Sequence, residues 1–172
     1  SVARSLRTSK SNTLGFVTDE IATTPYAGRV LQGAQDAARK LGYILLTANT
    51  NNDADLENQE IAALRRYNVD GFLYAMMYHR VVDIPEALEG SPTVVVDSED
   101  AAGEVPSIYP DDELAGYDAT NRLIQAGCRR IVYYGTEADI IAQGLRFEGY
   151  KRALAEAGIP FDDALVVNVL EM

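Results

Sequence analysis

The sequence predicts an α/β fold in which parallel strands are covered by helices on both faces. Three observations lead to this prediction. Short apolar runs alternate with segments of helical periodicity along the chain. The runs are apolar at nearly every position, as in strands that are buried on both faces. Polar turns rich in Asn, Asp and Gly separate the runs from the helical segments. This order of elements is typical of Rossmann-like sheets.

The first 110 residues contain most of the predicted strands. Apolar runs place these strands at residues 14–18, 43–48, 69–75, 93–96 and 105–109. Apolar residues at helical spacing predict a helix over residues 26–41, with Gly42 as its C-cap. Asp53 is expected to be the N-cap of a second helix that runs to about Tyr67, and a short helix or loop is expected around residues 84–88.

The remaining residues contain fewer elements. Asp111 is expected to open a helix that Gly127 ends, followed by a strand at residues 131–134. A loop to Gly144 should precede a helix through Ala157, and a further strand should begin at Leu165. So few strands do not make an independent sheet. Either the second lobe is truncated or the chain is a fragment, and the second explanation is favoured.

The loops at the carboxyl ends of the predicted strands mark where a ligand would bind. In open parallel sheets these loops form the ligand crevice. The loops are residues 18–26, 48–53, 75–82, 97–103 and 135–146. The sequence thus predicts the position of a site before it says anything about its chemistry.

Composition limits the classes of function. The net charge of −11 should repel DNA from the body of the chain. Residues 1–18 contain Arg4, Arg7 and Lys10 and no acid, whereas the rest carries 12 basic and 26 acidic residues. The simplest interpretation of these basic N-terminal residues is an ordinary polar linker, and charge alone favours it.

Cofactors, membranes and secretion are not expected. A single cysteine, Cys128, can form no internal disulfide, which fits a cytoplasmic protein. A single histidine, His79, excludes a His-rich metal site, and it is expected to be an ordinary loop residue. No apolar run could span a bilayer, the N-terminus is no secretory signal, and no phosphate-binding loop, GxGxxG or HExxH motif occurs.

A series of short motifs follows in a familiar order over nearly the whole chain. They are Ala3-Arg4-Ser5-Leu6, residues 11–17, Pro25-Tyr26-Ala27, Lys40-Leu41-Gly42-Tyr43, Val69-Asp70-Gly71-Phe72-Leu73, Val94-Val95-Val96-Asp97, residues 123–131 and residues 146–154. In this order they resemble the lactose/galactose-repressor (LacI/GalR) family of transcriptional regulators. The chain departs from the family at Cys128, where His is usual, and at Asp112, where Asn is usual.

The resemblance implies a periplasmic-binding-protein-like fold. Members have a helix-turn-helix, a hinge helix and two Rossmann-like lobes around an effector cleft. By this comparison residues 1–12 are the end of the hinge helix and a linker, residues 13–110 the N-terminal lobe, and residues 111–172 a partial C-terminal lobe. Leu6 would be the hinge leucine that wedges into the DNA minor groove, with Arg4 in the same turn. Taken alone, one basic turn is not expected to form a helix.

Arg146 and Asp97 are the first candidates for effector binding. The family carries a ligand arginine at the position of Arg146, whose guanidinium could bind effector hydroxyls or an anion. The alternative is a solvated arginine in the first turn of a helix, where a cation is unfavourable and should need a ligand or an acid partner. Asp97 ends a strand, where its carboxylate could accept hydrogen bonds from two sugar hydroxyls. The alternative is an aspartate that caps a helix or stabilises a turn. In an empty cleft these two residues could also pair.

Four further residues are weaker candidates. Tyr26 could stack on a sugar or base, or could belong to the core because it shares a helical stripe with apolar residues. Asp19 and Thr24 lie in the same loop as Tyr26. Tyr78 follows the third strand, where side chains more often pack than bind.

Taken together, these features favour the effector-binding region of a repressor. A sugar-like effector would change operator affinity allosterically in a homodimer, and a carbohydrate is preferred over a nucleobase. The operator would be read by a helix-turn-helix that this chain lacks. The alternative is a periplasmic sugar-binding protein of a transport system, against which the hinge motif argues. An enzyme is not expected, because no nucleophile–base pair is present.

Overall fold

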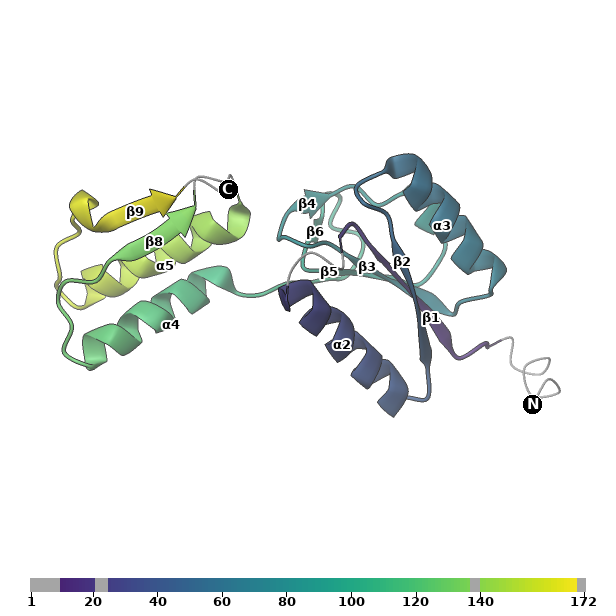
Figure 1. The fold of residues 1–172 in the computed structure, drawn as a ribbon, viewed down its shortest axis with the longest axis horizontal. Coiled ribbons are helices and arrows are strands. Elements are labelled where there is room, and N and C mark those ends of the chain that lie inside the picture. Colours follow the sequence, from purple (N-terminus) through teal and green to yellow (C-terminus); the bar gives the residue numbers. More distant parts are fainter. Residues whose placement is uncertain (1–9, 21–24, 137–139, 170–172) are drawn as a thin grey trace. The chain divides into compact units, whose positions relative to one another are not determined.

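The structure is a computed structural model that describes residues 10–20, 25–136 and 140–169. The chain forms two compact units, Ser1–Tyr109 and Pro110–Met172, and each is described by itself (Figure 1). In the described ranges no helix combines the length and the apolar character that a membrane span requires.

The first unit is built on a five-stranded parallel sheet. Its strand order is β2-β1-β3-β5-β7. The strands are β1 (Thr13–Thr18), β2 (Ile44–Asn49), β3 (Gly71–Ala75), β5 (Thr93–Val96) and β7 (Ser107–Ile108). Figure 1 shows α2 (Pro25–Lys40) and α3 (Ala54–Arg66) on opposite sides of this sheet. The predicted α/β class is therefore confirmed, and β1 lies between β2 and β3 with its Val17 fully buried.

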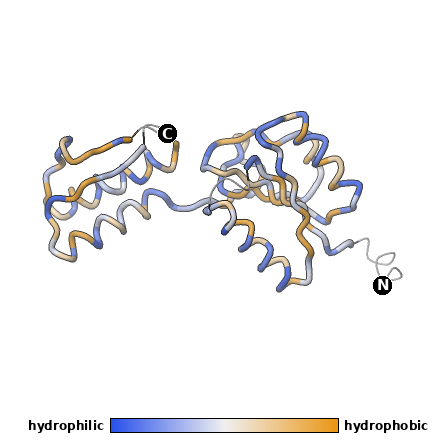
Figure 2. The backbone as a smooth tube through the Cα atoms, viewed as in Figure 1, coloured by the Kyte–Doolittle hydropathy of each residue, from blue (hydrophilic) through white to orange (hydrophobic). Residues whose placement is uncertain are grey.

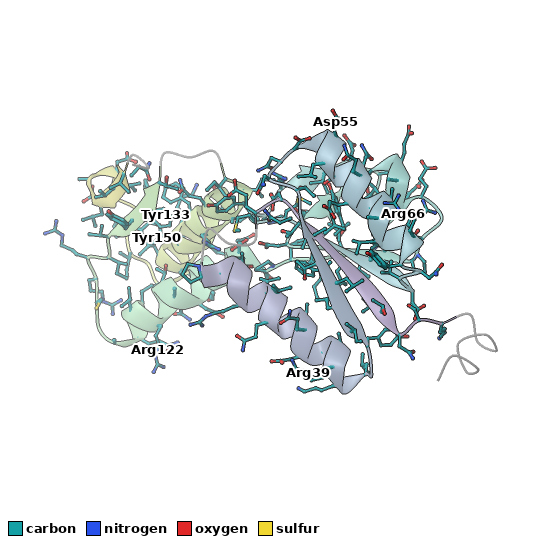
Figure 3. The ribbon with its side chains drawn as sticks, turned by 45° about the vertical axis from the view of Figure 1, so that its right-hand side comes forward. Arg39, Asp55, Arg66, Arg122, Tyr133 and Tyr150 are labelled. Carbon is teal, nitrogen blue, oxygen red and sulfur yellow. The ribbon has the colours of Figure 1, made fainter. Side chains whose placement is uncertain are left out.

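Local signals in the sequence explain where the helices of this unit begin and end. The Asp53 carboxylate caps α3 by accepting the N–H groups of Asp55 and Leu56 at 2.9 and 3.0 Å. Gly42 has a φ of 79°, which allows the chain to turn after α2. Figure 3 labels Asp55 and Arg66 at opposite ends of α3, an arrangement that complements the helix dipole.

The core of the first unit gathers between the sheet and α3. The buried residues of this cluster are Val17, Ala48, Ile61, Leu64, Phe72, Tyr74, Met76 and Leu88. Figure 2 shows the strands mainly in the hydrophobic colour, whereas the helices alternate between hydrophobic and hydrophilic. This pattern is what burial of both sheet faces requires.

In its described residues the second unit contains two α-helices, two strands and a short 3-10 helix, η2 (Asp163–Leu165). In chain order the α-helices and strands are α4 (Asp112–Gln125), β8 (Tyr133–Thr136), α5 (Ile141–Glu156) and β9 (Val166–Val169). The strands β8 and β9 pair in parallel. The core consists of Ile131, Tyr150 and Leu154 with partly buried neighbours, and Asp111 caps α4 by accepting the N–H of Leu114 at 2.9 Å.

Some predicted element boundaries in the second unit are wrong. The strand β8 begins at Tyr133 rather than at Ile131, because Ile131 is buried and its carbonyl accepts the Tyr150 hydroxyl at 2.9 Å. The helix α5 begins at Ile141, before the loop was expected to end, and its N-cap Ile140 makes no side-chain capping bond that the sequence could reveal. Arg146 therefore lies in the second turn of α5 and not in the first.

One pair of strands in the first unit was not predicted. The strands β4 (Val81–Val82) and β6 (Glu99–Asp100) form a separate parallel pair. They lie in the loops that follow β3 and β5. Each is only two residues long, too short for an apolar pattern to indicate it.

Candidate functional site

Asp19 joins two of the loops at the carboxyl edge of the first unit's sheet. This residue follows β1 and is only 4% exposed. Its Oδ1 accepts the N–H of Met77, after β3, at 2.9 Å, and its Oδ2 pairs with Nη2 of Arg80 at 3.0 Å. The Asp19 carboxylate thus joins the loops after β1 and β3. Sequence reasoning singled out Asp19 but missed Arg80, whose only signal was a cation in the loop after a strand.

Asp97 follows β5 at the same edge. It is 4% exposed and adopts a left-handed φ of 57°, which Asp tolerates better than most residues. Its N–H donates to the carbonyl of Ile108 at 2.8 Å. The structure therefore places Asp97 as a buried carboxylate in an uncommon backbone conformation at the carboxyl edge of the sheet.

His79 lies in a loop, as expected, but it is buried within an interaction cluster. Its Nε2 lies 2.9 Å from Oε1 of Glu99, and its ring stacks on Tyr109 with centroids 4.5 Å apart. The Glu99 carboxylate raises the pKa of the Tyr109 hydroxyl. The pairing of β4 with β6 brings Glu99 to His79, so no sequence pattern could have indicated the cluster.

Tyr26 and Tyr78 both present large surfaces to solvent. They are 46% and 50% exposed. The buried positions of α2 are Ala27 and Ala38, so the alternative that Tyr26 belongs to the core is wrong. Both rings therefore lie at the surface of the first unit and not in its core.

Glu57 and Tyr74 form a partly buried hydrogen bond between α3 and β3. The Tyr74 hydroxyl donates to Oε2 of Glu57 at 3.0 Å. Burial raises the pKa of the Glu57 carboxyl above 4.5 and also raises the pKa of the Tyr74 hydroxyl, to which the Glu57 charge contributes. The charged form of Glu57 therefore costs the fold some stability.

Compared with wild type, Glu57→Gln should raise the free energy of unfolding more at pH 7 than at pH 4. Because the folded pKa of Glu57 is raised, the folded state binds more protons than the unfolded state just above pH 4.5. The free energy of unfolding consequently falls as the pH rises through this window, and the substitution removes that loss. Urea denaturation at both pH values checks this, with Glu60→Gln on the same helix as the control. An equal effect at both pH values would contradict the prediction.

In the second unit, Arg146 is paired with an acid. Its Nε and Nη2 lie 2.7 and 2.6 Å from Oδ1 of Asp112. The Asp112 side chain is 2% exposed and the Arg146 side chain 54%. The acid partner that the sequence led us to expect is therefore Asp112, in the first turn of α4.

Two glycines allow α4 and α5 to approach closely enough for this pair. A Cβ at Gly116 would lie 2.1 Å from the carbonyl oxygen of Arg146, and one at Gly149 would lie 2.0 Å from that of Glu113. Neither position has room for a side chain. The helix backbones are thus in contact where Arg146 reaches Asp112.

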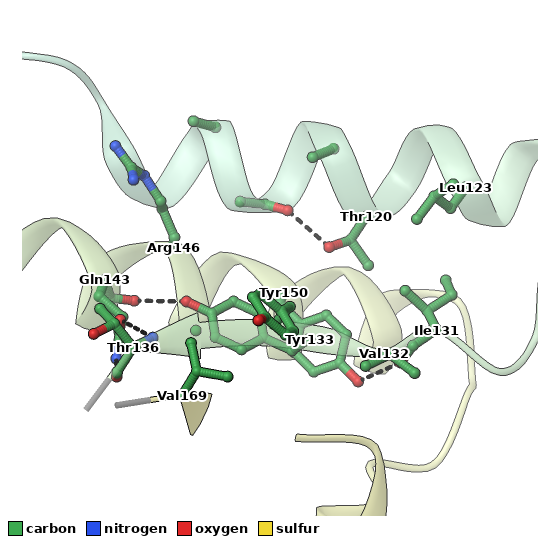
Figure 4. A pocket seen from close by; sticks show the side chains of 15 residues that line it. Thr120, Leu123, Ile131, Val132, Tyr133, Thr136, Gln143, Arg146, Tyr150 and Val169 are labelled. Carbon is green, nitrogen blue, oxygen red and sulfur yellow. Dashed lines mark hydrogen bonds between the residues drawn. The ribbon is translucent and has the colours of Figure 1, made fainter. Parts of the chain in front are cut away.

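A pocket of about 720 Å³ opens beside Arg146 between α4, β8 and α5. It is lined by Ala115, Gly116, Ala119, Thr120, Leu123, Ile131, Val132, Tyr133, Tyr134, Gly135, Thr136, Gln143, Arg146, Tyr150 and Val169. Figure 4 shows Gln143 and Thr136 at the end of the pocket near Arg146. There the N–H of Thr136 donates to Oε1 of Gln143 at 2.6 Å, and the Tyr133 hydroxyl donates to the carbonyl of Gln143 at 3.0 Å.

Three predicted site residues lie outside the described residues. They are Thr24 and the two hinge residues Arg4 and Leu6. Within the described part of the chain no group of three or more His, Cys, Asp or Glu side chains could hold a metal ion.

Known proteins resemble this chain along almost its whole length. Residues 11–171 match the family described as periplasmic binding proteins and sugar binding domain of LacI family. The HTH-type transcriptional regulator RegA of Clostridium saccharobutylicum is 33% identical over 168 residues, which make up 96% of this chain and 50% of RegA.

Two solved structures are similar as well. A protein described as a LacI-family transcriptional regulator from Rhizobium etli is 34% identical, has a TM-score of 0.81, and is matched over 94% of this chain and 57% of its own. A sugar-binding LacI-family regulator from Escherichia coli, solved with phosphate, is 27% identical with a TM-score of 0.65 over 92% of this chain and 58% of its own. The chain thus spans about half the length of RegA and somewhat more of the solved proteins.

Proposed function

Because the chain belongs to the family of periplasmic binding proteins and LacI-family sugar-binding domains, we propose that it is the effector-binding region of an allosteric transcriptional repressor. The observation that carries this proposal is the Arg146–Asp112 pair beside the pocket of the second unit. A pocket with apolar walls and few placed polar groups is typical of a small-molecule site.

The effector is an uncharged sugar-like molecule. The Asp112 carboxylate compensates the charge of Arg146, so an anionic ligand would gain little from the guanidinium. The Arg146 side chain is half exposed and can still donate to hydroxyl groups. The rings of Tyr133 and Tyr134 line the same pocket, and aromatic faces suit the apolar faces of sugars. In the first unit, Asp97, Asp19, Tyr26, Tyr78 and Thr24 are the proposed contacts.

The protein acts by binding and not by catalysis. The effector shifts the population of lobe arrangements, and this shift changes the affinity of a DNA-reading segment for its operator. Such a segment would precede residue 11 in a longer polypeptide, with Leu6 and Arg4 at the DNA hinge. A homodimer in the cytoplasm is the proposed setting, and no cofactor is required.

A calorimetric screen on the longest polypeptide that contains this chain tests the proposal. Neutral sugars and their phosphate esters form the panel, and a neutral sugar is expected to bind. Tight binding of phosphate esters alone would overturn the assignment of an uncharged effector, and no binding across the panel would overturn the sugar class.

Arg146→Ala combined with Asp112→Asn should reduce effector affinity by about a hundredfold. A hydrogen bond that involves a charged group is worth roughly 1.5–3 kcal/mol. Arg146→Ala alone is unsuitable, because it removes the guanidinium that pairs with the buried Asp112 carboxylate and should destabilise the unit. The single variant Asp112→Asn is the control, since it keeps Arg146, and it should retain binding. Wild-type affinity in the double variant would remove Arg146 from the site.

A further inference from the structure

Asp70 lies at the amino edge of the first unit's sheet, opposite the candidate effector edge. It immediately precedes β3, and its side chain contacts the residues that precede β1. Its Oδ1 accepts the N–H of Ser11 at 2.9 Å and the Ser11 hydroxyl at 3.2 Å. Its Oδ2 accepts the N–H of Asn12 at 2.9 Å. Both oxygens of one carboxylate are therefore used on two residues that lie 59 and 58 positions earlier in the chain.

The backbone around Asn12 is fixed as well. Its carbonyl accepts the N–H of Ile44 at 2.9 Å, and the next carbonyl, of Thr13, accepts the N–H of Asp70 at 2.7 Å. Asn12 has a left-handed φ of 55°. This bend turns two successive N–H groups, those of Ser11 and Asn12, toward the Asp70 carboxylate. The point where the chain enters β1 is thus set by its contacts with β2 and with the start of β3.

A second carboxylate joins the other end of the same two strands. Asp19, after β1, accepts the N–H of Met77, after β3. Between these two ties β1 and β3 are paired from Leu14↔Gly71 to Thr18↔Ala75. A Cβ at Gly15 would lie 2.8 Å from the ring of Phe72, its partner in this register. The two strands are therefore closely packed and tied at both ends, so they should move as one body.

We propose that Asp70 is a positioning residue that fixes the backbone of Ser11 and Asn12, where the segment before Ser11 joins the sheet. Through the tied pair β1–β3 it carries displacements of the effector edge to that segment. This role rests on the proposed function, in which the segment before Ser11 leads to the DNA-reading part of a longer polypeptide. The bonds that define it are contacts of this chain alone and do not depend on effector or DNA.

Limited trypsin digestion of the 172-residue chain tests the anchor, by which we mean the hydrogen bonds from Ser11 and Asn12 to the Asp70 carboxylate. The Lys10–Ser11 bond adjoins the anchored residues, and a protease must draw several residues around the bond into an extended form. Asp70→Ala should speed cleavage after Lys10 by about tenfold, which corresponds to roughly 1.4 kcal/mol of lost hydrogen bonding. Cleavage after Arg7 in the same molecules serves as the reference.

Two variants separate anchoring from general stability. Asp53→Ala removes a carboxylate that also accepts two backbone N–H groups, but within the start of α3. It should leave the cleavage ratio unchanged. Asp70→Asn keeps one acceptor oxygen and should fall between wild type and Asp70→Ala. A ratio within twofold of wild type in Asp70→Ala, or an equal rise in Asp53→Ala, would overturn the anchor.

Amide exchange measured by NMR gives a second readout on the same proteins. In Asp70→Ala the Ser11 and Asn12 amides should exchange about tenfold faster, while the amide of Val17 in β1 stays as protected as in wild type. Equal loss at Val17 would indicate mere destabilisation and would contradict the positioning role.

The transmission role is tested in the longest polypeptide that contains this chain. Asp70→Ala should leave effector affinity within about twofold and reduce the effector-induced change in operator affinity by about tenfold. Unchanged coupling together with a released Lys10–Ser11 bond would overturn transmission. If the polypeptide binds no DNA, the proposed function fails, while digestion and amide exchange still decide the anchor.

Discussion

Gly116→Ala is expected to destabilise the second unit by about 3 kcal/mol, although alanine ordinarily favours a helix over glycine. The new Cβ would lie 2.1 Å from the carbonyl oxygen and 2.7 Å from the Cα of Arg146. Backbone atoms cannot rotate away as a side chain can, so α4 and α5 must separate. Separation also withdraws Arg146 from Asp112, so effector affinity should fall together with stability.

Gly144→Ala is the matched control for this prediction. Gly144 is an exposed glycine of α5 with no atom within 4 Å of its Cβ position, so alanine there should stabilise by about 0.5–1 kcal/mol. Urea denaturation followed by hydrogen exchange of α4 and α5 peptides measures both variants. Similar stabilisation by both substitutions would show that the two helices are not in backbone contact.

Tyr150→Ala is expected to cost about 3–5 kcal/mol and to unfold most of the second unit. The Tyr150 side chain is 2% exposed. Its ring lies near those of Tyr133, Phe147 and Phe161, with centroids 5.4 to 6.4 Å apart. The described core of this unit has only two other buried members, Ile131 and Leu154, so little apolar packing remains to compensate this loss.

Two milder variants divide this effect into packing and hydrogen bonding. Tyr150→Phe keeps the ring but removes the donor to the buried carbonyl of Ile131, so it should cost about 1–3 kcal/mol. Tyr134→Ala removes a ring that is 69% exposed and should change stability by less than about 0.5 kcal/mol. Hydrogen exchange of α5 measures all three. Persistent protection of α5 in Tyr150→Ala would contradict the assigned core.

The candidate site could be predicted only one residue at a time. Asp97 was singled out because it ends an apolar strand, and Asp19 because it lies in the same loop as Tyr26. Parallel strands bring such ends to one edge. Arg146 was found through the family resemblance. Arg80, Glu99 and Tyr109 were missed, because their partners come from other loops and their sequence context is that of ordinary surface residues.

The outcome for Asp112 illustrates the same limit. It was noticed as a departure from the family's usual Asn, and no partner was assigned to it. The structure pairs it with Arg146, 34 residues away, which changes the charge that an effector would meet. The contact depends on two glycines that let two helices touch, and no spacing within either helix reveals it.

The sequence by itself determined the α/β class, the order of strands and helices, and most helix ends. These features depend on local causes: apolar periodicity, the Asp53 and Asp111 caps, and glycines that can adopt a positive φ. Only the tertiary structure decided the start of α5, the β4–β6 pair and the partners of the buried carboxylates. Those depend on contacts between residues distant in the chain, whose energies no local pattern encodes. The carboxylates of Asp19, Asp70 and Asp112 therefore look alike in the sequence and do three different things in the fold.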